Sequence, residues 1–142
     1  ILADPRNPKA QQLLNEKIKK RESFRPFAPS ILHEFGNEYF DNYQFTPFME
    51  RVLPIKKKKQ ALIPAVTHVD GSGRLQSVTI DLRPRYYKLI KEFQNISGIP
   101  ILINTSFNEN EPVVNIPDEA IDCFLRTDMD LLVLGNYVLE KK

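Results

Sequence analysis

Cysteine, histidine and glycine are scarce in this sequence, and each shortage excludes a class of site. The single cysteine, Cys123, leaves no internal disulfide, and its place in an apolar helical pattern predicts a buried thiol. The two histidines, His33 and His68, form no zinc-binding constellation with it, so we predict no metal site. With five glycines and no glycine-rich phosphate loop, any phosphate would have to be held by lysine and arginine side chains.

Long apolar runs are also missing. No stretch approaches the roughly 20 apolar residues of a membrane span, and no signal peptide opens the chain, so we expect a cytoplasmic protein without a membrane partner. The 142 residues are enough for a single domain with one core, residues 1–142. The chain opens without methionine and with an apolar pair already in progress, which predicts a fragment of a longer protein.

Positive charge gathers in two segments, although 20 basic and 18 acidic residues nearly balance to a net charge of +2. One segment holds Lys19, Arg21 and Arg25, with the two arginines flanking Phe24, and the other is the lysine run 56–59. Arginines held in an extended segment by packed aromatic residues offer planar, bidentate donors to a phosphate. The alternatives are arginines paired with neighbouring surface glutamates, and a lysine run that is only a solvated face.

Apolar periodicity and turn residues predict helices that alternate with strands. We expect helices over residues 8–20, 33–43, 84–97 and from 117, an extended segment over 21–32, strands over 47–55, 100–103 and 131–139, a hairpin over 63–80, and a loop over 56–60. These elements predict an α/β (α+β) fold in which helices flank a sheet of mixed strand directions.

The segment 99–112, IPILINTSFNENEP, is where we predict a ligand site. Its short apolar run is typical of a buried strand, and it ends in Asn104, Ser106 and Asn108. Amides and hydroxyls both donate and accept, and open α/β sheets place ligands at the carboxyl ends of their strands. The alternative is a simple turn, because Asn and Ser side chains commonly bond the local backbone.

The predicted hairpin adds two further candidates, His68 just before its turn and Arg74 just after it. Both could take part in chemistry, although a lone histidine is usually structural.

Five strings in register resemble the C-terminal domain of the O-carbamoyltransferases of the NodU and CmcH type. They are ILADPR, FRPFAPS, IPAVTHVDGSGRLQSV, LINTSFNENEP and MDLLVLGNYV, which together cover nearly the whole chain. The resemblance implies a YrdC-like fold, a twisted mixed sheet with flanking helices, that makes carbamoyl adenylate from ATP and carbamoyl phosphate with Mg²⁺ as a helper. It also implies a partner, the N-terminal metal-binding domain of the same full-length chain, which would hold iron and transfer the carbamoyl group to a hydroxyl.

On individual residues, the resemblance implies catalytic roles for Lys19, Arg25, Arg74 and Ser106. The cations would neutralise phosphate charge, and Ser106 would hold an oxygen without acting as a nucleophile. The residues that would bind the nucleotide and carbamoyl phosphate are Lys19, Arg21, Arg25, His68, Arg74, Asn104, Ser106 and Asn108. One further arginine of the family is expected a few residues before Ile1 and is absent from this sequence.

Two other functions stay open at this point. A basic YrdC-like domain could bind RNA, and a domain of this kind could be purely structural, covering the metal-binding half. Aromatic residues interleaved with base-contacting cations are not evident in the sequence, so nucleic acid is not an expected partner.

Overall fold

The computed structural model describes residues 1–141, which form two compact units. The first comprises residues 1–11 and 26–105, and the second comprises residues 12–25 and 106 onward. The predicted mixed α/β fold is confirmed, because helices accompany a five-stranded mixed sheet and a two-stranded sheet. None of the helices within residues 1–141 is long and apolar enough to cross a membrane.

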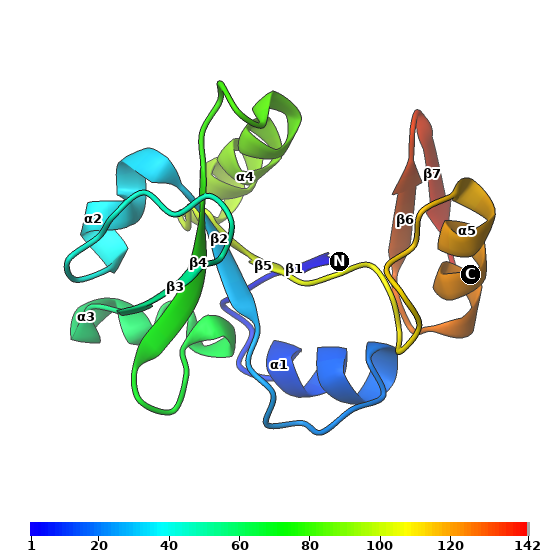
Figure 1. Cartoon of the computed structure of the whole chain (residues 1–142), viewed down its shortest axis with the longest axis horizontal. Helices are drawn as coiled ribbons and strands as arrows, with labels where there is room; N and C mark the ends of the chain where they lie inside the picture. The colour runs from blue at the N-terminus through cyan, green and yellow to red at the C-terminus, as the bar shows by residue number, and fades with distance from the viewer. Residues whose placement is uncertain (142) are drawn as a thin grey trace. The chain divides into compact units, whose positions relative to one another are not determined.

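The first unit is built on the five-stranded sheet, whose strand order is β1-β5-β2-β4-β3 (Figure 1). The strands are β1 (Leu2–Ala3), β2 (Ala28–Leu32), β3 (Arg51–Pro54), β4 (Ser72–Val78) and β5 (Ile101–Asn104). β2 and β4 run parallel, and the other neighbouring pairs are antiparallel. The predicted strand at residues 100–103 is confirmed as β5, because its branched side chains are buried between β1 and β2.

Helix α4 (Pro84–Ser97) covers one side of this sheet, while the short helices α2 (Gly36–Tyr39) and α3 (Lys57–Gln60) lie on the other side (Figure 1). Proline suits the first turn of α4, and Gly98 ends the helix in the left-handed conformation at φ +77°. The helix buries Ile90 in a cluster with sheet residues Leu32, Val78 and Leu102. The prediction for this helix is confirmed.

The chain's first helix, α1 (Ala10–Leu13), continues as a π-helical segment over Leu14–Ile18. Asn7 prepares its start, since the Asn7 side-chain oxygen accepts a hydrogen bond from the Lys9 backbone N–H at 2.9 Å. A helix over residues 8–20 was predicted from this capping pattern; it is confirmed for residues 10–18, of which the last five are π-helical, and is wrong at both ends.

The second unit contains helix α5 (Pro117–Arg126) and the strands β6 (Leu131–Leu134) and β7 (Tyr137–Glu140). α5 buries Cys123 and Phe124, which confirms the predicted buried thiol, whereas Leu125 is 66% exposed. The prediction of one final strand is wrong. The chain reverses at Gly135, whose φ of +62° a glycine adopts without strain, and the two halves pair as a hairpin.

Two further sequence predictions are wrong in the first unit. Residues 63–69 do not form a hairpin with β4; Pro64–Val66 is a 3₁₀ turn, and the partners of β4 are β2 and β3. Proline lacks the N–H that a paired strand would need at this place. The predicted loop 56–60 contains the one-turn helix α3, because Lys and Gln are good helix formers.

Candidate functional site

Lys19 is the most buried of the charged residues predicted for the site, with 2% of its surface exposed. Its Nζ donates to the carbonyl (2.6 Å) and Oγ (3.1 Å) of Ser106, and to the carbonyl (2.9 Å) and Oδ1 (2.6 Å) of Asn108. Among residues 1–141, none of the ion pairs includes Lys19. The second unit thus brings together three predicted site residues around a cation that neutral oxygens surround.

Burial lowers the pKa of the Lys19 ammonium to about 8, and the positive charge of Arg21 contributes to the shift. The ammonium retains hydrogen bonds, but these do not replace the hydration that it has lost. A nearby anion would stabilise the protonated form of Lys19, so this site is suited to bind one.

Arg21 and Arg25 belong to the same unit and are positioned differently from Lys19. Arg21 donates from Nε to the Asn15 side-chain oxygen at 2.7 Å, and burial lowers the pKa of its guanidinium, with a further contribution from the charge of Arg25. The half-exposed Arg25 forms an ion pair with Glu22 at 2.8 Å, as the surface alternative proposed. Phe24, between the two arginines, is 76% exposed. The expectation that packed aromatic residues hold these arginines is therefore wrong for Phe24.

The chain from Ser106 to Glu111, here called the 106–111 loop, is held by its own side chains. Ser106 Oγ donates to Asn108 Oδ1 at 2.6 Å, and the Asn108 side-chain amide donates to the Glu111 carbonyl at 2.6 Å. These local bonds are what the turn alternative predicted. The same oxygens also accept from Lys19, so the loop is both a turn and a lysine-binding cradle.

Asn104 lies in the first unit, at the end of β5, within a polar cluster on the sheet. Its side-chain amide donates to the Gln76 side-chain oxygen at 3.0 Å, and the buried Ser30 hydroxyl donates to the same oxygen at 2.7 Å. The Tyr86 hydroxyl is buried and has no hydrogen-bond partner within the described residues. Because its side-chain oxygen accepts from Asn104 on β5 and from Ser30 on β2, Gln76 of β4 links three strands. Sequence reasoning did not single out Gln76.

His68 and Arg74 also lie in the first unit. The His68 Nδ1 lies 3.3 Å from the Ser72 hydroxyl, and the His68 backbone N–H donates to the Ser72 carbonyl at 2.8 Å. Burial lowers the pKa of the His68 imidazole, so the ring is neutral at physiological pH. Arg74 is exposed on β4, two residues before Gln76, so strand alternation places both side chains on one face of the sheet.

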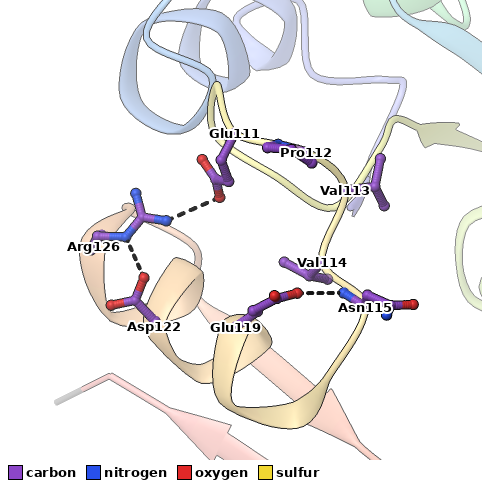
Figure 2. A pocket seen from close by; sticks show the side chains of 8 residues that line it. All are labelled: Glu111, Pro112, Val113, Val114, Asn115, Glu119, Asp122 and Arg126. Carbon is purple, nitrogen blue, oxygen red and sulfur yellow. Dashed lines mark hydrogen bonds and ion pairs between the residues drawn. The ribbon is translucent and has the colours of Figure 1, made fainter.

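A pocket of about 290 Å³ lies in the second unit, and none of the predicted site residues lines it (Figure 2). Three of its lining side chains are carboxylates, and Arg126 is its one cation, already bonded to Glu111 and Asp122. The remaining lining residues are Pro112, Val113, Val114, Asn115 and Glu119. This balance of charge does not suit a phosphate.

The residues that sequence reasoning missed differ in whether any signal could have found them. Gln76 follows Arg74 at the strand period of two, and that spacing marks a shared face. Arg126 gave no such signal. Basic residues are common in the last turn of a helix because they interact favourably with the helix dipole, so its position does not indicate a site. In the part of the chain that the structure describes, no three His, Cys, Asp or Glu side chains gather as metal ligands.

Comparison with known proteins gives a consistent relationship over the chain's length. The family described as Carbamoyltransferase C-terminus matches residues 1–141. The chain is 47% identical to nodulation protein NolNO of Sinorhizobium fredii, over 100% of this chain and 22% of that protein. It is 44% identical to nodulation protein NolO of Bradyrhizobium diazoefficiens (100% and 27%) and 38% identical to nodulation protein U of Sinorhizobium fredii (76% and 19%). The chain spans about a quarter of the length of these relatives.

Proposed function

Since this chain belongs to the Carbamoyltransferase C-terminus family, we propose that it is the domain of an O-carbamoyltransferase that binds ATP and carbamoyl phosphate and makes carbamoyl adenylate. The observation that carries this proposal is the environment of Lys19, a buried ammonium bonded to neutral oxygens of Ser106 and Asn108. A buried positive charge without an anionic partner is costly to keep, and it is suited to receive a phosphate.

The cations nearest to Lys19 support the same reading. Arg21 and Arg25 follow it in the chain. Burial is the main cause that lowers the pKa of Lys19 and of Arg21, and the charge of Arg21 adds to the first shift and that of Arg25 to the second. Charges of one sign held in one unit repel each other until an anion is bound between them. In the proposed site, the phosphates of ATP or carbamoyl phosphate supply that anion. Arg74 is proposed as a further phosphate-binding residue, as the resemblance implies.

The proposed reaction begins with carbamoyl phosphate, which water cleaves to carbamate and inorganic phosphate. A carbamate oxygen then forms a bond to the α-phosphorus of ATP. The bond from that phosphorus to the bridging oxygen breaks, and pyrophosphate leaves with the electron pair. The contribution of the chain is to position the two reactants and to balance the charge that develops, because no nucleophilic side chain takes part.

Neutral oxygens would also suit Mg²⁺, which prefers oxygen ligands and usually accompanies nucleotide phosphates. Ser106 Oγ and Asn108 Oδ1, however, already accept hydrogen bonds from the Lys19 ammonium, so these oxygens do not suit the ion, and we propose that Mg²⁺ would be held by the phosphates of ATP. When bound, Mg²⁺ would neutralise part of the phosphate charge.

Transfer of the carbamoyl group to a hydroxyl is proposed for a further part of a full-length protein. The relatives are about four times as long as this chain, which leaves room for a second domain. We propose that this domain is N-terminal and binds metal, including the iron, as the resemblance implies.

The proposal is tested by titrating ATP and carbamoyl phosphate, separately and together, and by measuring pyrophosphate release. We expect pyrophosphate to appear only when both substrates are present. Arg25→Ala and Arg74→Ala should each weaken ATP binding by about tenfold or more, since a charge-assisted hydrogen bond contributes roughly 1.5 to 3 kcal/mol. Arg85→Ala, an exposed arginine on α4, is the matched control.

Two results would count against the proposal. Equal affinities for the parent protein, Arg25→Ala and Arg74→Ala would remove those residues from the site. Absence of any carbamoyl-phosphate-dependent pyrophosphate release would remove the adenylate chemistry, even if ATP bound. Circular dichroism of each variant keeps a loss of fold from being mistaken for a loss of ligand contact.

A further inference from the structure

The 106–111 loop is tied to one side chain of helix α5. Arg126, in the last turn of α5, donates from Nη1 to Glu109 at 2.5 Å and from Nη2 to Glu111 at 3.0 Å. Its Nε donates to Asp122, one turn earlier on the same helix, at 2.7 Å. A single planar guanidinium thus joins two carboxylates of the loop to α5, as Figure 2 shows for Glu111.

The first of these carboxylates also connects the loop to the segment that carries Lys19. Glu109 has a side chain that is only 10% exposed, and it forms a second ion pair with Lys20 at 2.8 Å. The backbone at Lys20 is left-handed, at φ +44°, an uncommon conformation for a residue with a side chain. Lys19 and Lys20, adjacent in the chain, therefore both bond the same loop, one to its neutral oxygens and one to its carboxylate.

The second carboxylate shapes the loop from within. Glu111 accepts hydrogen bonds from the backbone N–H of Glu109 at 3.2 Å and of Asn110 at 3.0 Å, in addition to the Arg126 guanidinium. Backbone hydrogen bonding is the main cause that lowers the pKa of this carboxyl to about 2, and Arg126 contributes to the shift. Glu111 therefore stays ionised, and its attachment to Arg126 is maintained, at physiological pH.

We infer that Arg126 is a positioning residue, which holds the 106–111 loop in the shape that presents its oxygens to Lys19. Within residues 1–141, the hydrogen bonds and ion pairs of Arg126 do not involve Lys19, so its effect passes through the two glutamates. The inference rests on the proposed function, because the loop oxygens affect substrate binding only if a phosphate binds beside Lys19. It extends the site to a helix that none of the predicted residues occupies.

The test uses the 142-residue chain with Arg126→Gln, Arg126→Lys and Asp122→Asn. Arg126→Gln removes both ion pairs to the loop, and we expect ATP affinity to fall by about tenfold, the usual scale for a residue that acts through others. Arg126→Lys keeps the charge without the planar fork and should restore part of that affinity. Asp122→Asn removes only the partner on the helix, and affinity should stay within about twofold of the parent protein.

Amide hydrogen exchange gives a second readout that needs no ligand. Arg126→Gln should speed exchange at residues 106–111 and leave α4 unchanged, whereas Asp122→Asn should leave both unchanged. A Ser106→Ala change should cost less ATP affinity in Arg126→Gln than in the parent protein, because the loop is already displaced. A structural effect spread over the whole unit would instead speed exchange throughout α5 and lower the affinity additively.

The two proposals fail in different ways. If the parent protein binds no ATP, the proposed function is wrong, and the exchange measurement alone decides whether Arg126 positions the loop. If the parent protein binds ATP while Arg126→Gln shows the same affinity and unchanged loop exchange, the inference is overturned and the proposed function stands.

Discussion

The buried charge of Lys19 forms no ion pair within residues 1–141, although the charge of Glu111 acts on it, and this sets up opposite effects on stability and on binding. The free energy of unfolding should be unchanged or raised in Lys19→Met, within about 1 kcal/mol, because the side-chain stem is kept and a buried charge is removed. Ser106 is exposed, so water can replace the lost donor. ATP binding should fall to below a tenth of its parent value, and urea unfolding together with calorimetric titration checks both.

Lys17→Met is the matched control for this substitution. Lys17 lies in the same helical segment two residues earlier, and its side chain is exposed, so neither stability nor affinity should change much. If Lys19→Met lost stability and kept its affinity for ATP, Lys19 would stabilise the 106–111 loop without binding ATP.

The lowered pKa of Lys19 leads to a prediction about pH. An anion binds the protonated ammonium, and the Lys19 pKa of about 8 means that this form is complete below pH 7 and declines above 8. Affinity for ATP should therefore be flat below pH 7 and fall about tenfold for each unit above 8. Because binding raises the pKa, titrations near pH 8.5 in two buffers of different ionisation enthalpy should also detect proton uptake.

Arginine does not titrate in this range, so the pH profile isolates the lysine. The slope should disappear in Lys19→Met. Affinity that stayed constant from pH 7 to 9.5 in the parent protein would contradict a role for the Lys19 charge in binding.

At the level of single residues, sequence reasoning identified side chains better than it identified their neighbours. Lys19, Ser106 and Asn108 were selected from different segments, and the structure places them in hydrogen-bond contact. That Lys19 is buried and Phe24 exposed could not be predicted, because both follow from how the segment packs and not from its composition. Spacing along the chain indicates local pairs such as Arg25 with Glu22, but not the pairing of Arg126 with Glu109.

Helix α4 is the element whose sequence pattern and packing agree most closely, and it allows a prediction with an internal control. Ile90 is fully buried against Leu32, Val78 and Leu102, and Leu89 beside it is 49% exposed. Ile90→Ala should lower the free energy of unfolding by about 3 kcal/mol through lost burial and a cavity. Leu89→Ala should change it by less than about 0.5 kcal/mol, since surface substitutions seldom do more.

Chemical denaturation of both variants checks this prediction, with the slope against denaturant showing whether the transition stays cooperative. Similar losses for the two variants would mean that α4 does not cover the sheet through the Ile90 face. ATP affinity measured on the folded fraction should be unchanged in both, because neither residue belongs to the predicted site.

Elements that were predicted wrongly share a physical cause. In residues 63–69 a strand was predicted where Pro64–Val66 forms a 3₁₀ turn, and in residues 131–139 a single strand was predicted where a hairpin forms. Pro64 cannot donate to a ladder, and Gly135 followed by Asn136 is a strong hairpin turn signal inside an apolar run. Turn chemistry within an apolar segment should therefore outweigh its periodicity. Strand partners, such as β2 beside β4, depend on distant segments and are not encoded in either strand alone.

On the scale of the whole chain, charge balance separates the proposed function from RNA binding. The 20 basic and 18 acidic residues leave a net charge of +2, and several cations are already paired with carboxylates in the structure. RNA affinity depends on many simultaneous phosphate contacts and grows steeply as salt is removed, whereas a nucleotide meets a few local cations.

We therefore expect a fluorescent 20-nucleotide RNA to show no saturable binding at about 50 mM salt, where a phosphate-binding surface with many contacts would be strongest. ATP should bind under the same conditions and lose only a few-fold in affinity on going to about 200 mM salt, as a site with two or three charge contacts should. Anisotropy titrations of the two ligands in parallel make the comparison. RNA binding that is tight, salt-dependent and weakened by Lys56→Gln would instead favour a nucleic-acid module, because the lysine run lies outside every residue assigned to the phosphate site.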